Sequence, residues 1–98
     1  MPDLRFEWDE QKNIRNRRKH GVSFEEARTV FLDEHALLIP DPDHAAQDDR
    51  FILLGLSAVL RVLVVCHCYP SGGNVIRLIS ARKANDMERS AYHHRKRT

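Results

Sequence analysis

The sequence lacks an apolar run long enough to cross a membrane. None of its hydrophobic stretches approaches the roughly 20 consecutive apolar residues of a transmembrane helix. The first residues, Met1 to Arg5, also lack the apolar core of a secretion signal. These absences exclude membrane-spanning proteins, and we expect a cytoplasmic protein with no membrane partner.

Cysteine is scarce, and no metal-ligand motif stands out. The only cysteines, Cys66 and Cys68, lie two positions apart in a strand-like run, so both side chains point to one face in a geometry that disfavours a disulfide. His67 lies between them, but a structural zinc site needs about four ligands with loop-like spacing. We therefore predict no metal and no cofactor, and we interpret both cysteines as small buried hydrophobes.

Net charge is also small, at +2 for 98 residues, a length that predicts one domain covering residues 1–98. The near-balance hides an uneven distribution along the chain. Gln11–His20 contains five Lys or Arg and no acid, whereas Asp33–Asp49 contains six acids and no Lys or Arg. This asymmetry favours a polyanionic partner on the basic surface, with the acidic segment facing elsewhere.

The N-terminal part of the chain predicts a strand followed by a helix. Leu4–Trp8 alternates apolar and charged residues, as a strand with one buried face does. Asp9 is placed to cap a helix over residues 10–20, and Gly21 is placed to end it. Within that helix only Ile14 is a clear apolar anchor, so the cationic side chains cover a mostly exposed surface.

A second helix is predicted by a capping box, in which Ser23 precedes Glu26 by three residues. A narrow apolar stripe runs along it, made of Phe24, Ala27, Val30 and Phe31. Strands are then expected at His35–Ile39, Arg50–Leu56, Arg61–Tyr69 and Asn74–Arg82, followed by a last helix from about Asn85 with Met87, Ala91 and Tyr92 facing inward. The predicted fold is α+β: a small antiparallel sheet in the order β-α-α-β-β-β-β-α, with two N-terminal helices packed on it.

The last predicted strand carries polar groups that a buried strand does not need. Val75, Ile76, Leu78 and Ile79 read as a strand covered on both faces. Burying an unpaired cation is costly, so the polar side chains at its exit are expected to bind an anion. These are Arg77, Ser80, Arg82 and Lys83. The alternative is that the last of them mark only the point where the strand leaves the core.

The chain resembles the BrnT toxins of bacterial type II toxin–antitoxin systems, within the RelE/ParE-like toxin group. The resemblance lies in Phe6–Asp9, Lys12, Asn13, Lys19–Ala27, Val30, Phe31, Arg50, Gly55, Arg61–Val65, Ile76–Ala84, Glu88 and Tyr92. Two positions depart from the family pattern: Leu60 stands where glycine is usual, and Pro70 stands where many members have arginine.

The resemblance implies a RelE/ParE-like fold and a metal-independent endoribonuclease that inhibits growth. It also implies neutralisation by a ribbon-helix-helix antitoxin, with operator DNA contacted only through that partner. The antitoxin is expected to cover the cationic surface, and Asp33–Asp49 is a second candidate contact. Two other functions remain open: a non-catalytic antitoxin-binding partner in an autorepression complex, and a basic nucleic-acid-binding module.

Metal-free RNA cleavage uses the 2′-hydroxyl of the RNA as nucleophile, so the protein must move two protons and stabilise charge on phosphorus. Arg61, Arg82 and Lys83 are predicted to serve the phosphate. Lys12, Lys19, Arg77 and Ser80 are predicted RNA contacts, with a solvated helix face as the alternative for the two lysines.

Three side chains are candidates for proton transfer. His20 lies at a helix C-terminus that would favour its charged form, which would suit an acid, although it could simply cap the helix. His67 lies in mid-strand, where a structural histidine is an equal alternative. Tyr92 is a candidate through resemblance to RelE-like toxins, with a core contact as the alternative.

A hairpin turning at Ser71–Gly72 would place Arg61 opposite Arg82 and Leu63 opposite Ser80. By alternation these side chains would share one face with His67. Two opposed arginines repel, and a bound phosphate would relieve that repulsion, which predicts a phosphate clamp. Alanine at either arginine should then abolish toxicity and leave the melting temperature equal or slightly higher.

Overall fold

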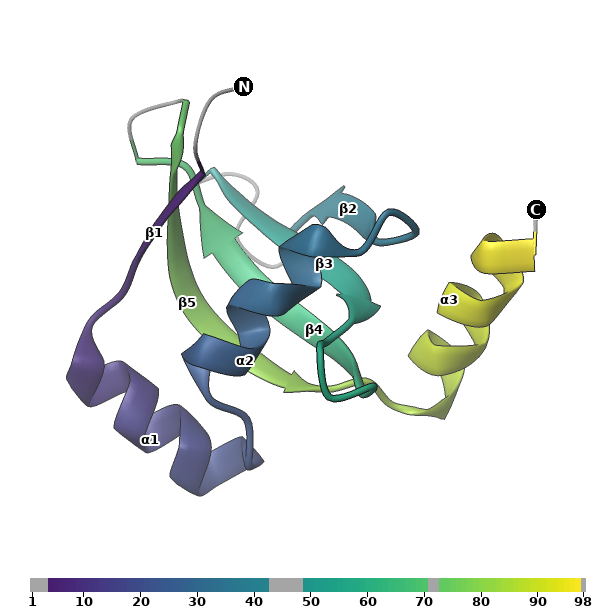
Figure 1. The fold of residues 1–98 in the computed structure, drawn as a ribbon, viewed down its shortest axis with the longest axis horizontal. Helices are drawn as coiled ribbons and strands as arrows, with labels where there is room; N and C mark the ends of the chain where they lie inside the picture. The colour runs from purple at the N-terminus through teal and green to yellow at the C-terminus, as the bar shows by residue number, and fades with distance from the viewer. Residues whose placement is uncertain (1–3, 43–48, 71–72, 98) are drawn as a thin grey trace.

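The computed structural model describes residues 4–42, 49–70 and 73–97. Its elements are β1 (Arg5–Glu7), α1 (Glu10–His20), α2 (Phe24–Thr29), the 3₁₀ helix η1 (Val30–Leu32), β2 (Leu37–Pro40), β3 (Arg50–Leu56), β4 (Val62–Cys68), β5 (Val75–Lys83) and α3 (Asp86–Arg97). Helices α1 and α2 lie over one face of the sheet. Helix α3 follows the C-terminal end of β5 and stands to the right of the sheet in Figure 1. Within the described residues, no helix is long and apolar enough to span a membrane.

The five strands form one mixed sheet in the order β1-β5-β4-β3-β2. Strands β2 to β5 pair antiparallel, but β1 pairs parallel with β5, with Arg5 opposite Val75. The prediction of a purely antiparallel sheet is therefore wrong. Short connectors force neighbouring strands to run antiparallel, whereas the long path from β1 through both helices and three strands leaves either direction open.

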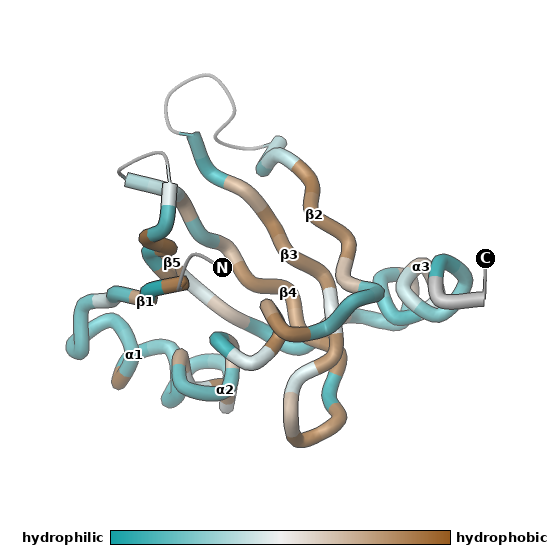
Figure 2. The backbone as a smooth tube through the Cα atoms, turned by 45° about the horizontal axis from the view of Figure 1, so that its top comes forward, coloured by the Kyte–Doolittle hydropathy of each residue, from teal (hydrophilic) through white to brown (hydrophobic). Residues whose placement is uncertain are grey.

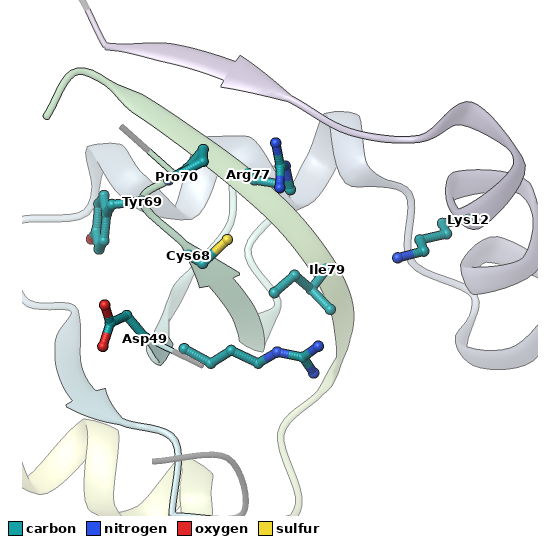
Figure 3. Close-up of a pocket in the computed structure, with 8 residues that line it drawn as sticks. Lys12, Asp49, Cys68, Tyr69, Pro70, Arg77 and Ile79 are labelled. Carbon is teal, nitrogen blue, oxygen red and sulfur yellow. The ribbon is translucent and has the colours of Figure 1, made fainter. Parts of the chain in front are cut away.

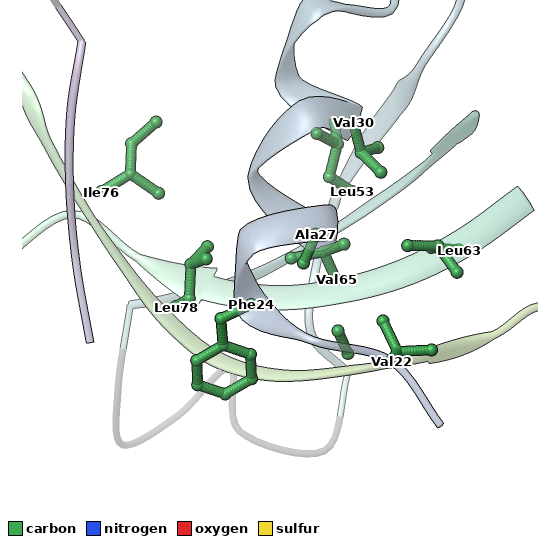
Figure 4. Packing of buried hydrophobic residues seen from close by; sticks show 10 residues of the cluster. Val22, Phe24, Ala27, Val30, Leu53, Leu63, Val65, Ile76 and Leu78 are labelled. Atoms are coloured by element: carbon green, nitrogen blue, oxygen red, sulfur yellow. The ribbon is translucent and has the colours of Figure 1, made fainter. Parts of the chain in front are cut away.

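The main core lies between α2 and the sheet (Figure 4). Phe24, Ala27 and Val30 are fully buried, as the apolar stripe predicts, and Val22 joins them from the α1–α2 turn. The sheet contributes Leu53, Leu63, Val65, Ile76, Leu78 and Ala81. This packing fixes the start of α2, and therefore Glu26, against the sheet.

Helix α1 is held by asparagines rather than by its apolar residue. Asn13 and Asn16 are buried, whereas Ile14 is 37% exposed, so the predicted anchor is wrong. Asn16 Nδ2 donates to Val22 O and Ala81 O, both at 2.8 Å, and its Oδ1 accepts from Ala81 N at 3.1 Å. Figure 2 shows α1 as a largely hydrophilic helix, whereas β3 and β4 are largely hydrophobic. Polar side chains can bury when every group finds a partner, and hydrophobic periodicity does not detect that.

The predicted helix caps form. Asp9 accepts from Gln11 N at 2.8 Å, and Gly21 takes the left-handed conformation at φ 70° that ends α1. Ser23 Oγ accepts from Glu26 N at 3.0 Å, but the Glu26 carboxylate does not return to Ser23. Only half of that capping box is made, because Glu26 has other partners.

Helix α3 starts with a complete capping box and packs through Tyr92. Asn85 N donates to Glu88 Oε1, and Glu88 N donates to Asn85 Oδ1, both at 2.8 Å. Tyr92 is 1% exposed and packs with Ala84 and with the outer-face residues of β3 and β4. Met87 is 81% exposed and Ala91 is exposed, so their predicted inward orientation is wrong. Tyr92 is the residue of α3 that is buried against the sheet, and an apolar pattern over two helical turns does not show which of its members will make that contact.

The predicted β4–β5 register is also wrong. Cys68 pairs with Arg77 where the prediction gave Val75, a shift of two residues that leaves every side chain on its expected face. Beyond it, His67 pairs with Leu78 but Cys66 pairs with Ser80, so Ile79 is an extra residue in a β-bulge. That single insertion exchanges the faces of all following residues, and Val64 comes to lie opposite Arg82.

The turn predicted at Ser71–Gly72 lies outside the described residues, as do residues 43–48 of the acidic segment. The turn between β3 and β4 is described, and Leu60 within it takes φ 66°. Only glycine adopts this left-handed conformation without strain, which accounts for a glycine at this position in the resemblance pattern. The turn places Arg61 at the entry to β4.

Candidate functional site

Arg61 is fixed at the corner where the β3–β4 turn meets the start of α2. Its Nε donates to Glu26 Oε2 at 3.0 Å, its Nη2 donates to Glu26 Oε1, and Nη2 also donates to Gly21 O at 3.0 Å. Among the described residues none accepts a bond from Nη1. The side chain keeps 32% of its surface exposed. The guanidinium is therefore oriented by protein contacts and has an open edge for an anion.

Glu26 is the functional residue that the sequence analysis missed. Its side chain is 12% exposed, and Oε2 also accepts from Ser57 Oγ at 2.7 Å. The hydrogen bond from Arg61 lowers the pKa of Glu26, and Lys83 contributes in the same direction. Its position in a capping box concealed this role, since no local pattern links it to Arg61, 35 positions later.

His20 is the solvent-accessible member of the three predicted proton-transfer candidates. It is the last residue of α1 and is half-buried. The carbonyl of the next residue, Gly21, accepts the hydrogen bond from Arg61. The backbone next to His20 therefore contacts Arg61. Lys19, one position earlier, is exposed on the last turn of α1.

His67 lies in the core rather than at a surface. It is 0% exposed, Nδ1 lies 3.2 Å from Val65 O, and Nε2 lies 3.0 Å from the hydroxyl of Tyr69. The rings of Phe31, Phe51 and Tyr69 surround it. Burial lowers the pKa of His67. These contacts match the structural alternative, because RNA cannot reach this imidazole while the core is closed.

Tyr92 is likewise held in the structure by a specific contact. Its hydroxyl donates to Asp33 Oδ2 at 2.6 Å, and Asp33 Oδ2 also accepts from Leu56 N at 2.8 Å. Burial, together with the Asp33 carboxylate, raises the pKa of Tyr92 to about 12. The phenol anchors α3 to the end of η1.

We expect Tyr92→Phe to lower the free energy of unfolding by about 1 kcal/mol and to leave RNA cleavage within about twofold of wild type. The variant keeps the ring in its pocket and removes only the hydrogen bond to Asp33. Urea unfolding and a labelled-RNA cleavage assay on the same preparation test both parts. A loss of cleavage of about 100-fold with unchanged stability would restore a catalytic role for this hydroxyl.

Arg82 and Arg61 lie on opposite faces of the sheet, which rules out the predicted clamp. Arg82 is paired instead with Glu88 by two parallel hydrogen bonds of 2.8 Å. The side chains are 43% and 27% exposed, and Arg82 lowers the pKa of Glu88. The shared-face prediction for Arg61, Leu63, Ser80, Arg82 and His67 fails because the bulge moves Ser80 and Arg82 to the other side.

Several predicted RNA contacts gather on that other face of the sheet. A hollow of about 340 Å³ is lined by Lys12, Asp49, Arg50, Cys68, Tyr69, Pro70, Arg77 and Ile79 (Figure 3). A second hollow of about 230 Å³ shares Arg50 and Ile79 and adds Ser80, Arg82, Cys66 and Asp41. Arg77 pairs with Glu7 at 2.6 Å. Together these hollows form a cation-rimmed surface over β3, β4 and β5.

The cysteines on this face are half-buried rather than fully buried, which corrects their predicted burial. Cys66 Sγ donates to Asp41 Oδ2 at 3.6 Å, and burial raises the pKa of the Cys66 thiol to about 11. Across residues 4–42, 49–70 and 73–97, no three His, Cys, Asp or Glu side chains group as a metal site would require.

Lys83 turns towards Arg61 at the other end of β5. It lies opposite Leu63, adds to the electrostatic field at Glu26, and borders a cleft of about 320 Å³ together with Arg61. The remaining cleft residues are Leu56, Leu60, Val62, Arg89 and His93. The predicted cations therefore divide into two groups. Arg61 and Lys83 lie with Glu26 at one corner, next to the end of α1 that carries His20, and most of the others lie on the cation-rimmed sheet face.

Comparison with known proteins identifies a family for the chain. Residues 8–88 match the family model described as the ribonuclease toxin BrnT of type II toxin–antitoxin systems. The 1.1 Å crystal structure of the Brucella abortus ribonuclease toxin BrnT is similar, with a TM-score of 0.66 and 26% sequence identity over 85% of this chain and 99% of that chain. No curated protein matches the chain.

Proposed function

The chain belongs to the BrnT family of ribonuclease toxins of type II toxin–antitoxin systems, and from that membership we propose that it cleaves RNA without a metal at the corner around Arg61. The observation that carries this proposal is the Arg61–Glu26 pair, which fixes a guanidinium and leaves Nη1 open. The proposed setting is the cytoplasm, and the wider relationship to RelE/ParE-like toxins stays a prediction.

Arg61 and Lys83 would hold the scissile phosphate. Two cations at one corner can offset the negative charge that accumulates on the phosphoryl oxygens in the transition state. Glu26 acts on Arg61 rather than on RNA, because its oxygens are already taken by Arg61 and Ser57. It is a positioning residue that keeps the guanidinium fork in one orientation.

His20, acting in its neutral form, would take the proton from the 2′-hydroxyl, the opposite of the acid role that its place at a helix C-terminus suggested. Of the three predicted candidates it alone reaches solvent among the described residues, and Gly21 connects it to Arg61. The resulting alkoxide attacks phosphorus, which gives a 2′,3′-cyclic phosphate and a 5′-hydroxyl. This chemistry needs proton transfer and charge stabilisation but no metal-bound water.

The cation-rimmed sheet face would bind the rest of the RNA strand. Lys12, Arg77 and Ser80 line its hollows, and Arg82 borders them while holding α3 through Glu88. Phosphate contacts of this kind add affinity that falls with salt. A ribbon-helix-helix antitoxin would neutralise the toxin by covering Arg61 and Lys83, and operator DNA would be bound through that antitoxin.

The test is cleavage of RNA by the purified chain in the presence of EDTA. We expect undiminished cleavage, 5′-hydroxyl and cyclic-phosphate ends, and full protection when the antitoxin is added. Arg61→Ala purified in parallel controls for contaminating nucleases. Activity that disappears with EDTA and returns with zinc or magnesium would overturn the metal-free mechanism.

A further inference from the structure

Helix α3 presents two ionisable side chains to the cleft that Arg61 and Lys83 border. Arg89 and His93 are four residues apart, so they lie on the same side of the helix, and both line the cleft of about 320 Å³. Neither belongs to the corner described above, and residue 93 lies beyond the matched residues 8–88. The cleft thus has one wall from the sheet and one wall from α3.

The position of α3 is fixed near its start and at its middle. At the start, Glu88 receives both hydrogen bonds from Arg82, and Ala84 N donates to Val62 O at 2.9 Å. Further along, Tyr92 donates to Asp33, and the His93 ring packs edge-on against Tyr92 at 5.4 Å. These anchors hold the backbone of α3 around His93 against the rest of the domain, and both His93 and Arg61 line the same cleft.

Cleavage by the 2′-hydroxyl requires two proton-transfer groups on opposite sides of the phosphate. The attacking and leaving oxygens lie roughly in line through phosphorus, so one residue cannot easily serve both. The α1–α2 turn and α3 flank the β3–β4 turn from opposite sides (Figure 1). His20 and Gly21 occupy the first side, and His93 occupies the second.

We propose that His93 is the general acid of the reaction, protonating the 5′-oxygen as it leaves. The inference rests on the proposed function of the Arg61 corner. The 2′-oxygen forms its bond to phosphorus as its proton passes to His20. The bond between phosphorus and the 5′-oxygen breaks, its electron pair stays on that oxygen, and the His93 imidazolium supplies the proton. Products are a cyclic phosphate and a 5′-hydroxyl.

The surroundings of His93 suit an anionic substrate. The charged groups that face it are Arg89 on its own helix, Lys83 from β5 and Arg61 at the entry to β4, with Tyr92 as the neighbouring titratable group. No carboxylate is among the described residues that line this cleft. Arg89 is anchored by Ala84 O at 2.8 Å and by Asp86. A phosphate in the cleft would therefore lie among cations and beside the imidazole.

The experiment compares His93→Gln with His94→Gln on two RNAs. His94 is the matched control, because it is exposed on the same helix and does not line the cleft. One RNA is unmodified, and the other carries sulfur in place of the 5′-oxygen at the linkage that the wild type cuts. Sulfur leaves without needing a proton, so this substrate does not depend on a general acid.

We expect His93→Gln to cleave the unmodified RNA about 100-fold more slowly and the sulfur-substituted RNA at close to the wild-type rate. His94→Gln should match the wild type on both. Equal slowing on both RNAs, or no slowing on either, would overturn the assignment of His93. In those cases Arg61→Ala would still show whether the corner cleaves RNA, whereas an inactive wild-type chain would refute the proposed function and this inference together.

Discussion

Arg61→Ala is expected to reduce RNA cleavage by about 100-fold or more and to make the protein less stable. The loss of rate follows from removing a cation that stabilises charge in the transition state. The loss of stability follows from Glu26, whose side chain is only 12% exposed in the wild type and would lose its main partner. We expect about 1–3 kcal/mol less free energy of unfolding, the usual cost of leaving a charged hydrogen-bonding group without its partner.

This expectation reverses the stability prediction drawn from the sequence. Opposed arginines would have made the alanine variant equally stable or more stable, but Arg61 faces a carboxylate rather than Arg82. Thermal melting and a cleavage assay test the two effects separately. Arg77→Ala is the matched control for the melting experiment only, because its exposed pair with Glu7 contributes little to stability.

A double-mutant cycle makes the test sharper. Glu26→Gln combined with Arg61→Ala should cost less stability than the two single changes added together, since the two side chains interact directly. Additive costs would contradict the structural role of the pair. Wild-type cleavage by Arg61→Ala would contradict its catalytic role.

Asn16→Ala is expected to cost about 3 kcal/mol of unfolding free energy, the largest stability effect of any substitution considered. The side chain satisfies three backbone groups: Val22 O, Ala81 O and Ala81 N. Each buried group left without a partner costs about 1–3 kcal/mol, and partial access of water lowers the total. The contact also joins α1 and the α1–α2 turn to β5, so the corner containing His20 should loosen.

Ile14→Ala provides the comparison on the same helix. Ile14 is 37% exposed, so its truncation should change the unfolding free energy by less than about 0.5 kcal/mol. Urea unfolding of both variants measures the two changes in unfolding free energy directly. If the isoleucine proved more costly than the asparagine, α1 would be held by apolar packing and the described role of Asn16 would be wrong.

The sequence alone predicts those features that depend on neighbouring residues. Asp9 and Gly21 act as the helix caps they were expected to be, and the last helix begins near Asn85 as expected, because each cap involves groups within four positions along the chain. The apolar stripe of α2 is buried for the same reason, since its period is a property of one helix. The BrnT resemblance drawn from motifs is confirmed by the family match over residues 8–88.

Partners across the sheet could not be predicted in this way. A single extra residue, Ile79, decides that Arg82 faces Glu88 instead of sharing a face with Arg61. A strand pattern of period two has no means of showing one inserted residue in advance. The parallel pairing of β1 with β5 is undetermined for a related reason, because a long connection permits both directions.

The candidate site shows the same division. The basic residues that we propose as phosphate ligands can be named from the sequence, because cationic side chains at a strand exit need a reason to be there. The partners of the site's side chains depend on contacts between distant segments. Glu26 pairs with Arg61, Asp33 accepts from Tyr92, and His93 lines the cleft that Arg61 borders. Local propensities determine where helices and strands begin and end, whereas the packing of whole elements determines which charged side chains pair with each other. Composition and periodicity carry no information about contacts between residues far apart in the sequence.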